Sequence, residues 1–271
     1  MDPLPGKKPR VSYLLTYPSY LGELVEAGRR LGYRPNDFGL ERIGVGGEIV
    51  TAGLKERCPE LFGAVTFVEG FGMTEIWPVS GNLCSHGHLH FEASQGLLEV
   101  VDPDTGAPSR PGEVGTLVVT PLPPYRDTTL VLRYDTEDLV RVLPEPLTCS
   151  LRHVPAVAQL LGKRRLAVRH GSHWICAREI AEALEAVRAG NGTARYGFWA
   201  VPAGVAVEVV VPRETGDTRR QIARELEARG VPLQALYLRP DRRQLCHPIP
   251  LRGDLREMSF PLPTVQVSSV A

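Results

Sequence analysis

The segment Glu69–Ile76 combines residue types that could bind a phosphate-bearing ligand. Its two glycines would let the backbone approach a flat ligand closely. Phe71 offers a ring face for stacking, whereas Thr74 and Glu75 supply a hydroxyl and a carboxylate for a phosphate or its Mg²⁺. A plain structural turn after the strand-like residues 64–68 is the alternative interpretation. The neighbouring segments therefore decide between the two.

Further segments of the chain carry matching chemistry in a fixed order. A Gly-Gly-Glu sequence, residues 46–48, precedes a helix-like Thr51–Cys58, and Asp138 lies in the strand-like Leu132–Val140. Leu161–Arg165 then opens the C-terminal part with a Gly-Lys pair. Together with Glu69–Ile76 and the opening Ser12–Leu21, these segments resemble the adenylate-forming superfamily, most closely its phenylacetate–CoA ligase branch.

The resemblance implies an ATP-dependent ligase and assigns roles to individual residues. In that family a carboxylate attacks the α-phosphate of ATP to give acyl-AMP and pyrophosphate, and the acyl group then passes to CoA or another thiol. An aryl or arylacetic acid is the substrate that the branch suggests. The implied roles are adenine binding by Gly47, Glu48, Phe71 and Gly72, phosphate and Mg²⁺ contact by the catalytic Thr74 and Glu75, ribose binding by Asp138, and a hinge at Lys163.

The resemblance also implies an α/β (mixed α+β) fold in two parts. We expect a partial large adenylation domain with a β-barrel-like subdomain at residues 1–161, and a small mobile α+β domain at residues 162–271. Strand-like residues 99–101 and 114–120, separated by turn residues, fit the subdomain. Helical periodicity at 178–188 and 218–229, with strand-like 198–201, 205–211 and 233–238, fits the smaller domain.

Two family features are not found where the resemblance places them. The residues ahead of Pro18 are Pro-rich and basic and form no Ser/Thr/Gly-rich phosphate loop. Asp254 stands where the family has a catalytic lysine, and a carboxylate cannot offset charge on the α-phosphate. The chain therefore resembles the later part of such an enzyme, truncated or degenerate. The alternative is an inactive nucleotide-binding or scaffolding homologue that acts with a protein subunit supplying the front region.

Cysteine and histidine residues in two places suggest a metal site. Cys84 to His90 holds one thiol and three imidazoles, and Cys149 is followed by His153. Thiolate and imidazole are the ligands that Zn²⁺ prefers. Several ligases of the resembled branch gather a structural zinc at positions that Cys84, His90 and Cys149 match. His153 is our choice of fourth ligand, with His88 or His86 as substitutes; exposed histidines beside unrelated buried cysteines are the alternative.

Composition excludes several classes of partner. Lys plus Arg and Asp plus Glu both number 31 among 271 residues, so no excess charge favours nucleic acid or an anionic membrane. No apolar run approaches the roughly 18 residues of a membrane span. The five cysteines indicate no disulfide framework. We therefore expect a cytoplasmic protein whose partners are ATP and a small-molecule carboxylate.

Overall fold

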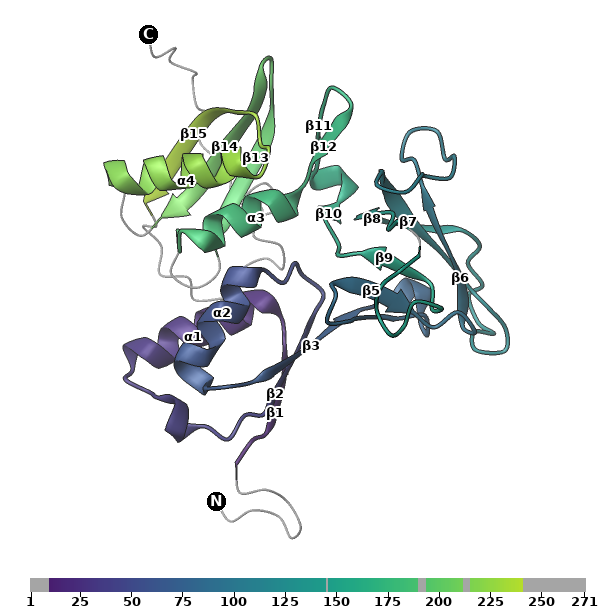
Figure 1. Ribbon diagram of the computed structural model, residues 1–271, viewed down its shortest axis with the longest axis horizontal. Coiled ribbons are helices and arrows are strands. Elements are labelled where there is room, and N and C mark those ends of the chain that lie inside the picture. The colour runs from purple at the N-terminus through teal and green to yellow at the C-terminus, as the bar shows by residue number, and fades with distance from the viewer. Residues whose placement is uncertain (1–9, 145, 190–193, 212–214, 241–271) are drawn as a thin grey trace.

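The computed structural model describes residues 10–144, 146–189, 194–211 and 215–240 (Figure 1). Two of the segments considered above lie outside these ranges: the basic N-terminal residues 1–9, and Asp254. None of the helices in the described ranges combines the length and apolar character needed to cross a membrane. The described fold consists of three sheets, four longer helices and a separate two-stranded ribbon.

The first layer is a six-stranded sheet in the order β1-β2-β3-β4-β5-β9. Its first three strands run parallel, and the pairs from β3 to β9 are antiparallel. Figure 1 shows both helices of this layer on the same side of the parallel strands. The elements are β1 (Tyr13–Thr16), α1 (Pro18–Arg30), β2 (Arg42–Gly46), α2 (Ala52–Phe62), β3 (Thr66–Phe71), β4 (Gly81–Leu83), β5 (His88–Phe91) and β9 (Ala156–Ala158).

Local sequence explains how these helices begin and pack. Pro18 occupies the first turn of α1, where its missing N–H costs nothing. The Thr51 hydroxyl caps α2 by accepting a bond from the Leu54 amide at 3.3 Å. A Cβ on Gly28 would lie 2.6 Å from a Leu61 methyl, so the glycine lets α1 and α2 pack closely. Leu61 itself is fully buried, and α2 therefore continues one turn beyond the expected Cys58.

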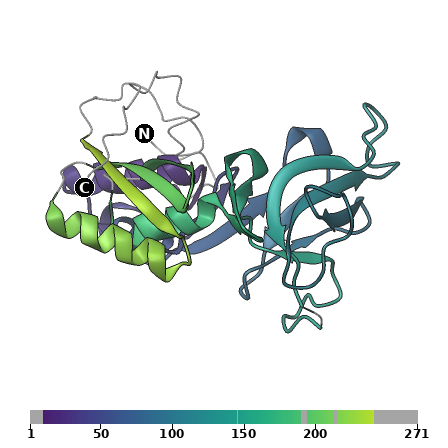
Figure 2. The same ribbon diagram turned by 90° about the horizontal axis from the view of Figure 1, so that it is seen from above.

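The second sheet has four antiparallel strands in the order β10-β8-β7-β6. It shares a buried apolar cluster with the first sheet, in which Phe91 and Val157 meet Leu117, Val119 and Val140. Figure 2 shows this sheet at the end of the molecule opposite helix α4. Its strands are β6 (Gly96–Val101), β7 (Val114–Pro121), β8 (Tyr134–Arg141) and β10 (Gly162–Lys163).

The C-terminal part has its own core of buried aliphatic and aromatic side chains. Strands β13 and β14 pair antiparallel, and β15 joins β14 in parallel. The elements are β11 (Val168–His170), β12 (His173–Ile175), α3 (Ala177–Ala186), β13 (Arg195–Val201), β14 (Gly204–Val211), α4 (Gly216–Ala228) and β15 (Leu233–Pro240), with short 3₁₀ turns at Pro35–Asp37, Thr74–Ile76 and Arg164–Leu166.

The fold matches the expected mixed α/β class of a partial adenylation domain. Both expected C-terminal helices and all three expected C-terminal strands are present, with ends shifted by a few residues. The domain boundary near Gly162 stays a prediction. The backbone of Gly162 is at φ +122°, and a Cβ on this residue would lie 2.9 Å from the Ala177 side chain. Glycine is therefore required where the second sheet meets α3.

Candidate functional site

One cavity of about 240 Å³ opens between the first layer, strand β8 and helix α3. The predicted cofactor-binding residues all line it, although they come from four separate segments: Gly47, Glu48, Phe71, Gly72, Asp138 and Lys163. Thr74 and Glu75 are exposed on the 3₁₀ turn that follows the lining residue Met73, and they are not among the lining residues. The structure thus groups six predicted residues and places the two predicted catalytic ones beside them.

The loop after β2 brings backbone rather than side chains to the cavity. Gly47 is at φ +79°, a region that disfavours residues with a Cβ. A Cβ on Gly47 would also lie 2.8 Å from the Tyr17 ring, and one on Gly46 would lie 2.6 Å from the Gly70 carbonyl oxygen. Gly46 therefore lets the ends of β2 and β3 approach each other, and Gly47 lets the loop after β2 lie against Tyr17.

Glu48 is held by the start of α1. Its two carboxylate oxygens accept hydrogen bonds from the Ser19 amide and the Ser19 hydroxyl, both at 2.8 Å. Burial raises the pKa of Glu48, and the two bonds from Ser19 oppose that rise. The carboxylate thus joins the loop after β2 to α1. The sequence analysis gave Ser19 no role of its own, whereas the structure places it in the cavity wall and in contact with Glu48.

Phe71 forms part of the cavity wall at the end of β3. Its ring packs edge-on against Phe91, with centroids 5.7 Å apart and an interplanar angle of 72°. Phe71 is 8% exposed, so the contact with Phe91 fixes the orientation of the ring. A planar ligand in the cavity would meet a side chain that is already ordered.

Asp138 supplies a buried carboxylate to the cavity. Its side chain is 8% exposed, and its Oδ2 lies 2.8 Å from Nζ of Lys163. Burial raises the pKa of Asp138, and the charge and hydrogen bond of Lys163 oppose that rise. A buried carboxylate paired with one ammonium group can still accept hydrogen bonds from ligand hydroxyls.

Helix α3 and strand β13 close the cavity from the C-terminal side. Tyr196 lines the cavity and donates a hydrogen bond of 3.0 Å to the Ala177 carbonyl oxygen. Glu185 also lines it and pairs with Arg57 of α2, whose Nη2 lies 2.6 Å from a carboxylate oxygen. Sequence reasoning missed these residues, because the pair joins positions 128 residues apart.

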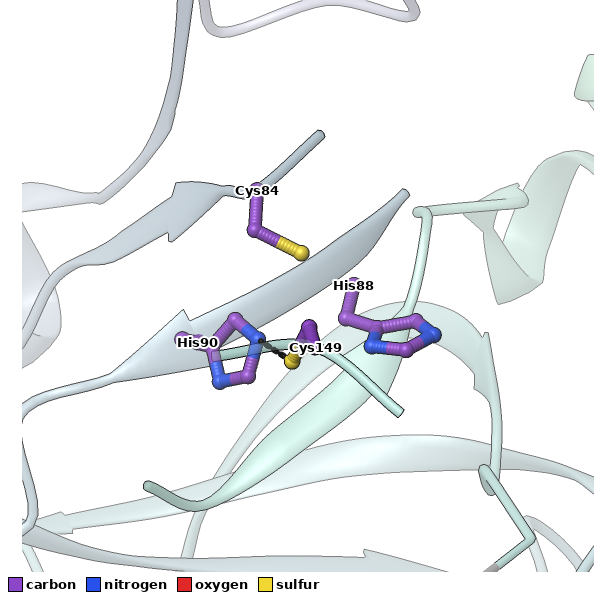
Figure 3. A group of neighbouring side chains, drawn as sticks. All are labelled: Cys84, His88, His90 and Cys149. Carbon is purple, nitrogen blue, oxygen red and sulfur yellow. Dashed lines mark hydrogen bonds between the residues drawn. The ribbon is translucent and has the colours of Figure 1, made fainter. Parts of the chain in front are cut away.

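A second cluster of functional side chains lies around β5. Cys84 follows β4, and its amide donates to the His88 carbonyl oxygen at 2.9 Å, which closes the turn between β4 and β5. His88 and His90 are two residues apart on β5 and share a face of the strand. Cys149 arrives from the loop after β8, and the potential ligand atoms of these four residues lie within 4.8 Å of one another (Figure 3).

The donor set and its hydrogen bonds fit a tetrahedral Zn²⁺. His90 Nδ1 donates to the Val154 carbonyl oxygen at 3.3 Å, so Nε2 keeps its lone pair, and Nε2 lies 3.3 Å from Cys149 Sγ. Zinc–ligand bonds of ordinary length would separate the ligand atoms by about 3.3–3.8 Å. His88 Nδ1 is buried and has no hydrogen-bond partner within the described chain. Small shifts of the four side chains toward a common centre would let His88 bind an ion there.

The fourth member of this cluster differs from the one first expected. His88, named as a substitute, lies with Cys84, His90 and Cys149, whereas His153 is exposed in the loop after Cys149. The reason is geometric: alternation along β5 puts His88 on the same face as His90. Spacing from Cys149 alone could not reveal this pairing.

Comparison with known proteins gives this geometry a family. Residues 7–121 match the model of the AMP-binding enzyme family. Over 149 residues, the chain is 36% identical to the phenylacetate-coenzyme A ligase of Thermus thermophilus. Over these residues the chain is similar to AMP-binding enzymes. The expected resemblance to adenylate-forming ligases of the phenylacetate–CoA type is confirmed.

Solved structures show the same fold across most of this chain. A 2-hydroxyisobutyryl-CoA ligase in the postadenylation state superposes with a TM-score of 0.69 at 22% identity, covering 91% of this chain and 55% of the ligase. A benzoate CoA ligase from Burkholderia xenovorans LB400 gives a TM-score of 0.63 at 15% identity, covering 91% and 50%. At such identities the likeness establishes the fold alone.

This chain spans only part of the length of the proteins that it matches. The matched segment is 54% of this chain but 33% of the Thermus thermophilus ligase, and the structural match covers about half of each ligase. The family match ends at residue 121, so Asp138, Cys149 and Lys163 lie beyond it. What supports a role for Asp138 and Lys163 is their place in the cavity, and for Cys149 it is its place beside Cys84, His88 and His90.

Proposed function

We propose that this chain binds the adenosine part of ATP and of an acyl adenylate, as a component of a ligase that activates carboxylic acids. The observation that carries this proposal is the convergence of four sequence segments on one cavity, with the buried carboxylate of Asp138 facing it. The match of residues 7–121 to the AMP-binding enzyme family independently supports a nucleotide ligand. Aryl and arylacetic acids are the proposed substrates, and CoA or another thiol the proposed acceptor.

Each part of the nucleotide has a proposed position. Adenine lies between the Gly47 loop and the wall formed by Phe71 and Gly72. The ribose hydroxyls donate to Asp138, where charge-assisted hydrogen bonds contribute about 1.5–3 kcal/mol each. Thr74 and Glu75, exposed beside the cavity, contact the phosphates and Mg²⁺. In the first step the carboxylate oxygen bonds to the α-phosphorus, and the bond to pyrophosphate breaks.

Calorimetric titration with AMP and with ATP–Mg²⁺ tests the binding site. Asp138→Ala should weaken nucleotide binding at least about tenfold. Asp104→Ala is the matched control, because its side chain is 62% exposed and pairs with Arg169 away from the cavity. Equal affinity of the Asp138 variant and the wild type would remove Asp138 from the site.

Catalysis by this chain alone is a separate question with its own experiment. We expect little or no carboxylate-dependent pyrophosphate exchange with a panel of aryl acids. Asp254 stands where the resemblance places a catalytic lysine, and a carboxylate cannot offset charge on the α-phosphate. Robust exchange by the 271-residue protein would contradict this expectation. An inactive nucleotide-binding or scaffolding homologue is the second candidate, and the same departure favours it.

The second cluster is proposed to hold a structural zinc ion. Cys84, His88, His90 and Cys149 would bind it, and four protein ligands leave no open position for a substrate. Burial, with the charges of His90 and His86, lowers the pKa of His88, which favours the neutral imidazole that a metal requires. The ion would fasten the loop after β8 to β5.

Neither an excess of charge nor a membrane-spanning helix in the described ranges suggests another class of partner, and we propose that the protein acts in the cytoplasm.

A further inference from the structure

The turn that carries Thr74 and Glu75 has little backbone structure of its own to hold it. It is a 3₁₀ turn of three residues, and both side chains are exposed. Two of the hydrogen bonds that close it are long: the Ile76 amide donates to the Met73 carbonyl oxygen at 3.3 Å, and the Trp77 amide donates to that of Thr74 at 3.4 Å. The fully buried side chain of Ile76 anchors one side of the turn. Its orientation therefore depends on contacts from elsewhere in the chain.

Arg126 supplies such contacts from the loop between β7 and β8. Its Nη1 donates a hydrogen bond to the Trp77 carbonyl oxygen at 2.9 Å and a longer one to the Thr74 carbonyl oxygen at 3.5 Å. Carbonyl groups at the end of a helical turn have few partners within the turn, and the guanidinium provides one for both. The two ends of the turn are thus held by one side chain that lies 52 and 49 residues further along the chain.

The same guanidinium holds the loop to which Arg126 belongs. Its Nε donates to the Thr129 carbonyl oxygen at 3.0 Å and to the Thr128 carbonyl oxygen at 3.2 Å. Arg126 is half-buried, whereas every other residue from 123 to 130 is exposed. The planar fork of donors therefore joins this loop to the turn of Thr74, a geometry that the single ammonium group of lysine cannot reproduce.

The positive charge of Arg126 is not neutralised by an acidic side chain. Its four side-chain hydrogen bonds all go to backbone carbonyl oxygens, and in the part of the chain that the structure describes no carboxylate lies within ion-pair distance of it. Arg133, at the end of the same loop, differs, because its Nε lies 3.1 Å from a carboxylate oxygen of Glu99. An unpaired guanidinium beside Thr74 and Glu75 remains available to attract the negative charge of phosphate groups.

We propose that Arg126 is a positioning residue for the phosphate part of the nucleotide. It holds the turn so that the Thr74 hydroxyl and the Glu75 carboxylate meet ATP–Mg²⁺ in one orientation, which lowers the entropy that binding costs. Its charge also favours the polyphosphate beside the turn. AMP, which lacks the β- and γ-phosphates, gains little from either effect. This role rests on the proposed nucleotide site and separates recognition of the phosphates from recognition of adenosine.

Calorimetric titration of Arg126→Ala in the full chain tests this role. Affinity for ATP–Mg²⁺ should fall about five- to tenfold, because a charge beside a partly exposed phosphate is screened only in part, whereas affinity for AMP should stay within about twofold of the wild type. Arg141→Ala is the matched control. It removes the same charge and a guanidinium bond of 2.7 Å to the Gly112 carbonyl oxygen, and Arg141 does not line the cavity. Both affinities of the control should equal those of the wild type.

Hydrogen–deuterium exchange separates positioning from charge. Without ligand, the amides of residues 75–77 should exchange faster in Arg126→Ala than in the wild type, because the turn has lost its contacts with the loop. Arg126→Lys keeps the charge without the fork. It should regain part of the affinity for ATP–Mg²⁺ while the turn still exchanges fast. A lysine variant that equals the wild type in both measurements would overturn the positioning role.

Further outcomes would overturn the proposal. If Arg126→Ala binds ATP–Mg²⁺ as tightly as the wild type, or weakens AMP and ATP–Mg²⁺ equally, Arg126 has no separate role toward the phosphates. If the turn exchanges at the wild-type rate in Arg126→Ala, the guanidinium does not hold it. A wild-type chain that binds neither nucleotide would instead refute the nucleotide site, and this role with it. Thermal melting shows that each variant is folded.

Discussion

Lys163 Nζ lies 2.8 Å from Asp138 Oδ2 and donates a second hydrogen bond of 2.7 Å to the Thr136 carbonyl oxygen. The contact follows from strand register, because Lys163 in β10 lies directly opposite Asp138 in β8. The residue predicted to act at the hinge therefore also holds the carboxylate predicted to bind ribose. The Lys163 side chain is 16% exposed and the Asp138 side chain 8% exposed, so solvent screens their ion pair weakly.

Lys163→Met should make nucleotide affinity depend on pH. Burial raises the pKa of Asp138, and Lys163 is the main influence opposing it, so removing the ammonium raises that pKa further. A protonated carboxyl group loses its charge-assisted bonds to ribose. Titration with AMP should show the Met variant losing affinity as the pH falls, whereas the wild type changes little.

Lys163→Arg keeps the positive charge and should restore the flat pH profile. A Met variant whose AMP affinity is as low at high pH as at low pH would show that Lys163 contacts the nucleotide directly. The Asp138→Asn variant separates the two cases, since its side chain does not titrate and its affinity should be independent of pH.

His88→Ala should remove the metal that we propose for the second cluster, and so should Cys149→Ser. His88 and Cys149 offer ligand atoms within the same group, whereas His153 is exposed outside it. Because structural zinc contributes directly to folding, loss of the metal should lower the melting temperature, and a chelator should do the same to the wild type. Elemental analysis measures zinc per chain after metal-replete expression.

His153→Ala is the matched control and should keep both its zinc and its melting temperature. Loss of zinc in that variant would restore the assignment made from sequence spacing. Much less than one zinc per wild-type chain would instead leave Cys84 and Cys149 as ordinary packed thiols.

Local motifs predicted the cavity better than they predicted the contacts around it. Gly47, Phe71 and Asp138 were found because each lies in a short motif with its own backbone requirement or charge. Ser19 and Glu185 lie in no such motif. Their roles depend on side chains 29 and 128 residues away, and sequence periodicity carries no information on such pairs. The sequence offered His88 only as a substitute ligand, because its position on β5 was needed to choose it over His153.

Glu185→Ala should destabilise the contact between α2 and α3 strongly. The Arg57 and Glu185 side chains are 2% and 5% exposed and lie 2.6 Å apart. Removing Glu185 takes the nearer carboxylate from the buried Arg57, whose Nη1 also lies 3.5 Å from Glu26, and weakening a buried ion pair in this way costs up to about 3–5 kcal/mol. Urea denaturation measures the free energy of unfolding. Glu60→Ala is the control: its ion pair with Arg188 also joins these two parts but is 33% and 51% exposed, so it should cost less than about 1 kcal/mol.

Glu185→Gln should fall between these variants, because the amide keeps a hydrogen bond to Arg57 without the charge. A Glu185→Ala variant as stable as the Glu60→Ala control would show that the guanidinium of Arg57 reaches solvent or another acceptor when its partner is removed.

Glu137→Gly should stabilise the protein relative to Glu137→Ala. Glu137 is at φ +58°, next to an irregularity in the pairing of β7 and β8 between Thr116 and Val118. A residue with a Cβ is destabilised by about 1–2 kcal/mol in this left-handed region, whereas glycine adopts it almost without strain.

The alanine variant isolates the backbone effect from the side-chain effect. Both substitutions remove the Glu137–Arg165 ion pair, whose side chains are 41% and 43% exposed and which contributes little. Only glycine relieves the strain, and its greater loss of backbone entropy on folding, about 0.5–1 kcal/mol, offsets part of the gain. We expect the glycine variant to be more stable than the alanine variant by about 0.5–1 kcal/mol in urea denaturation. Equal stabilities would mean that the backbone at residue 137 leaves the left-handed region once the ion pair with Arg165 is removed.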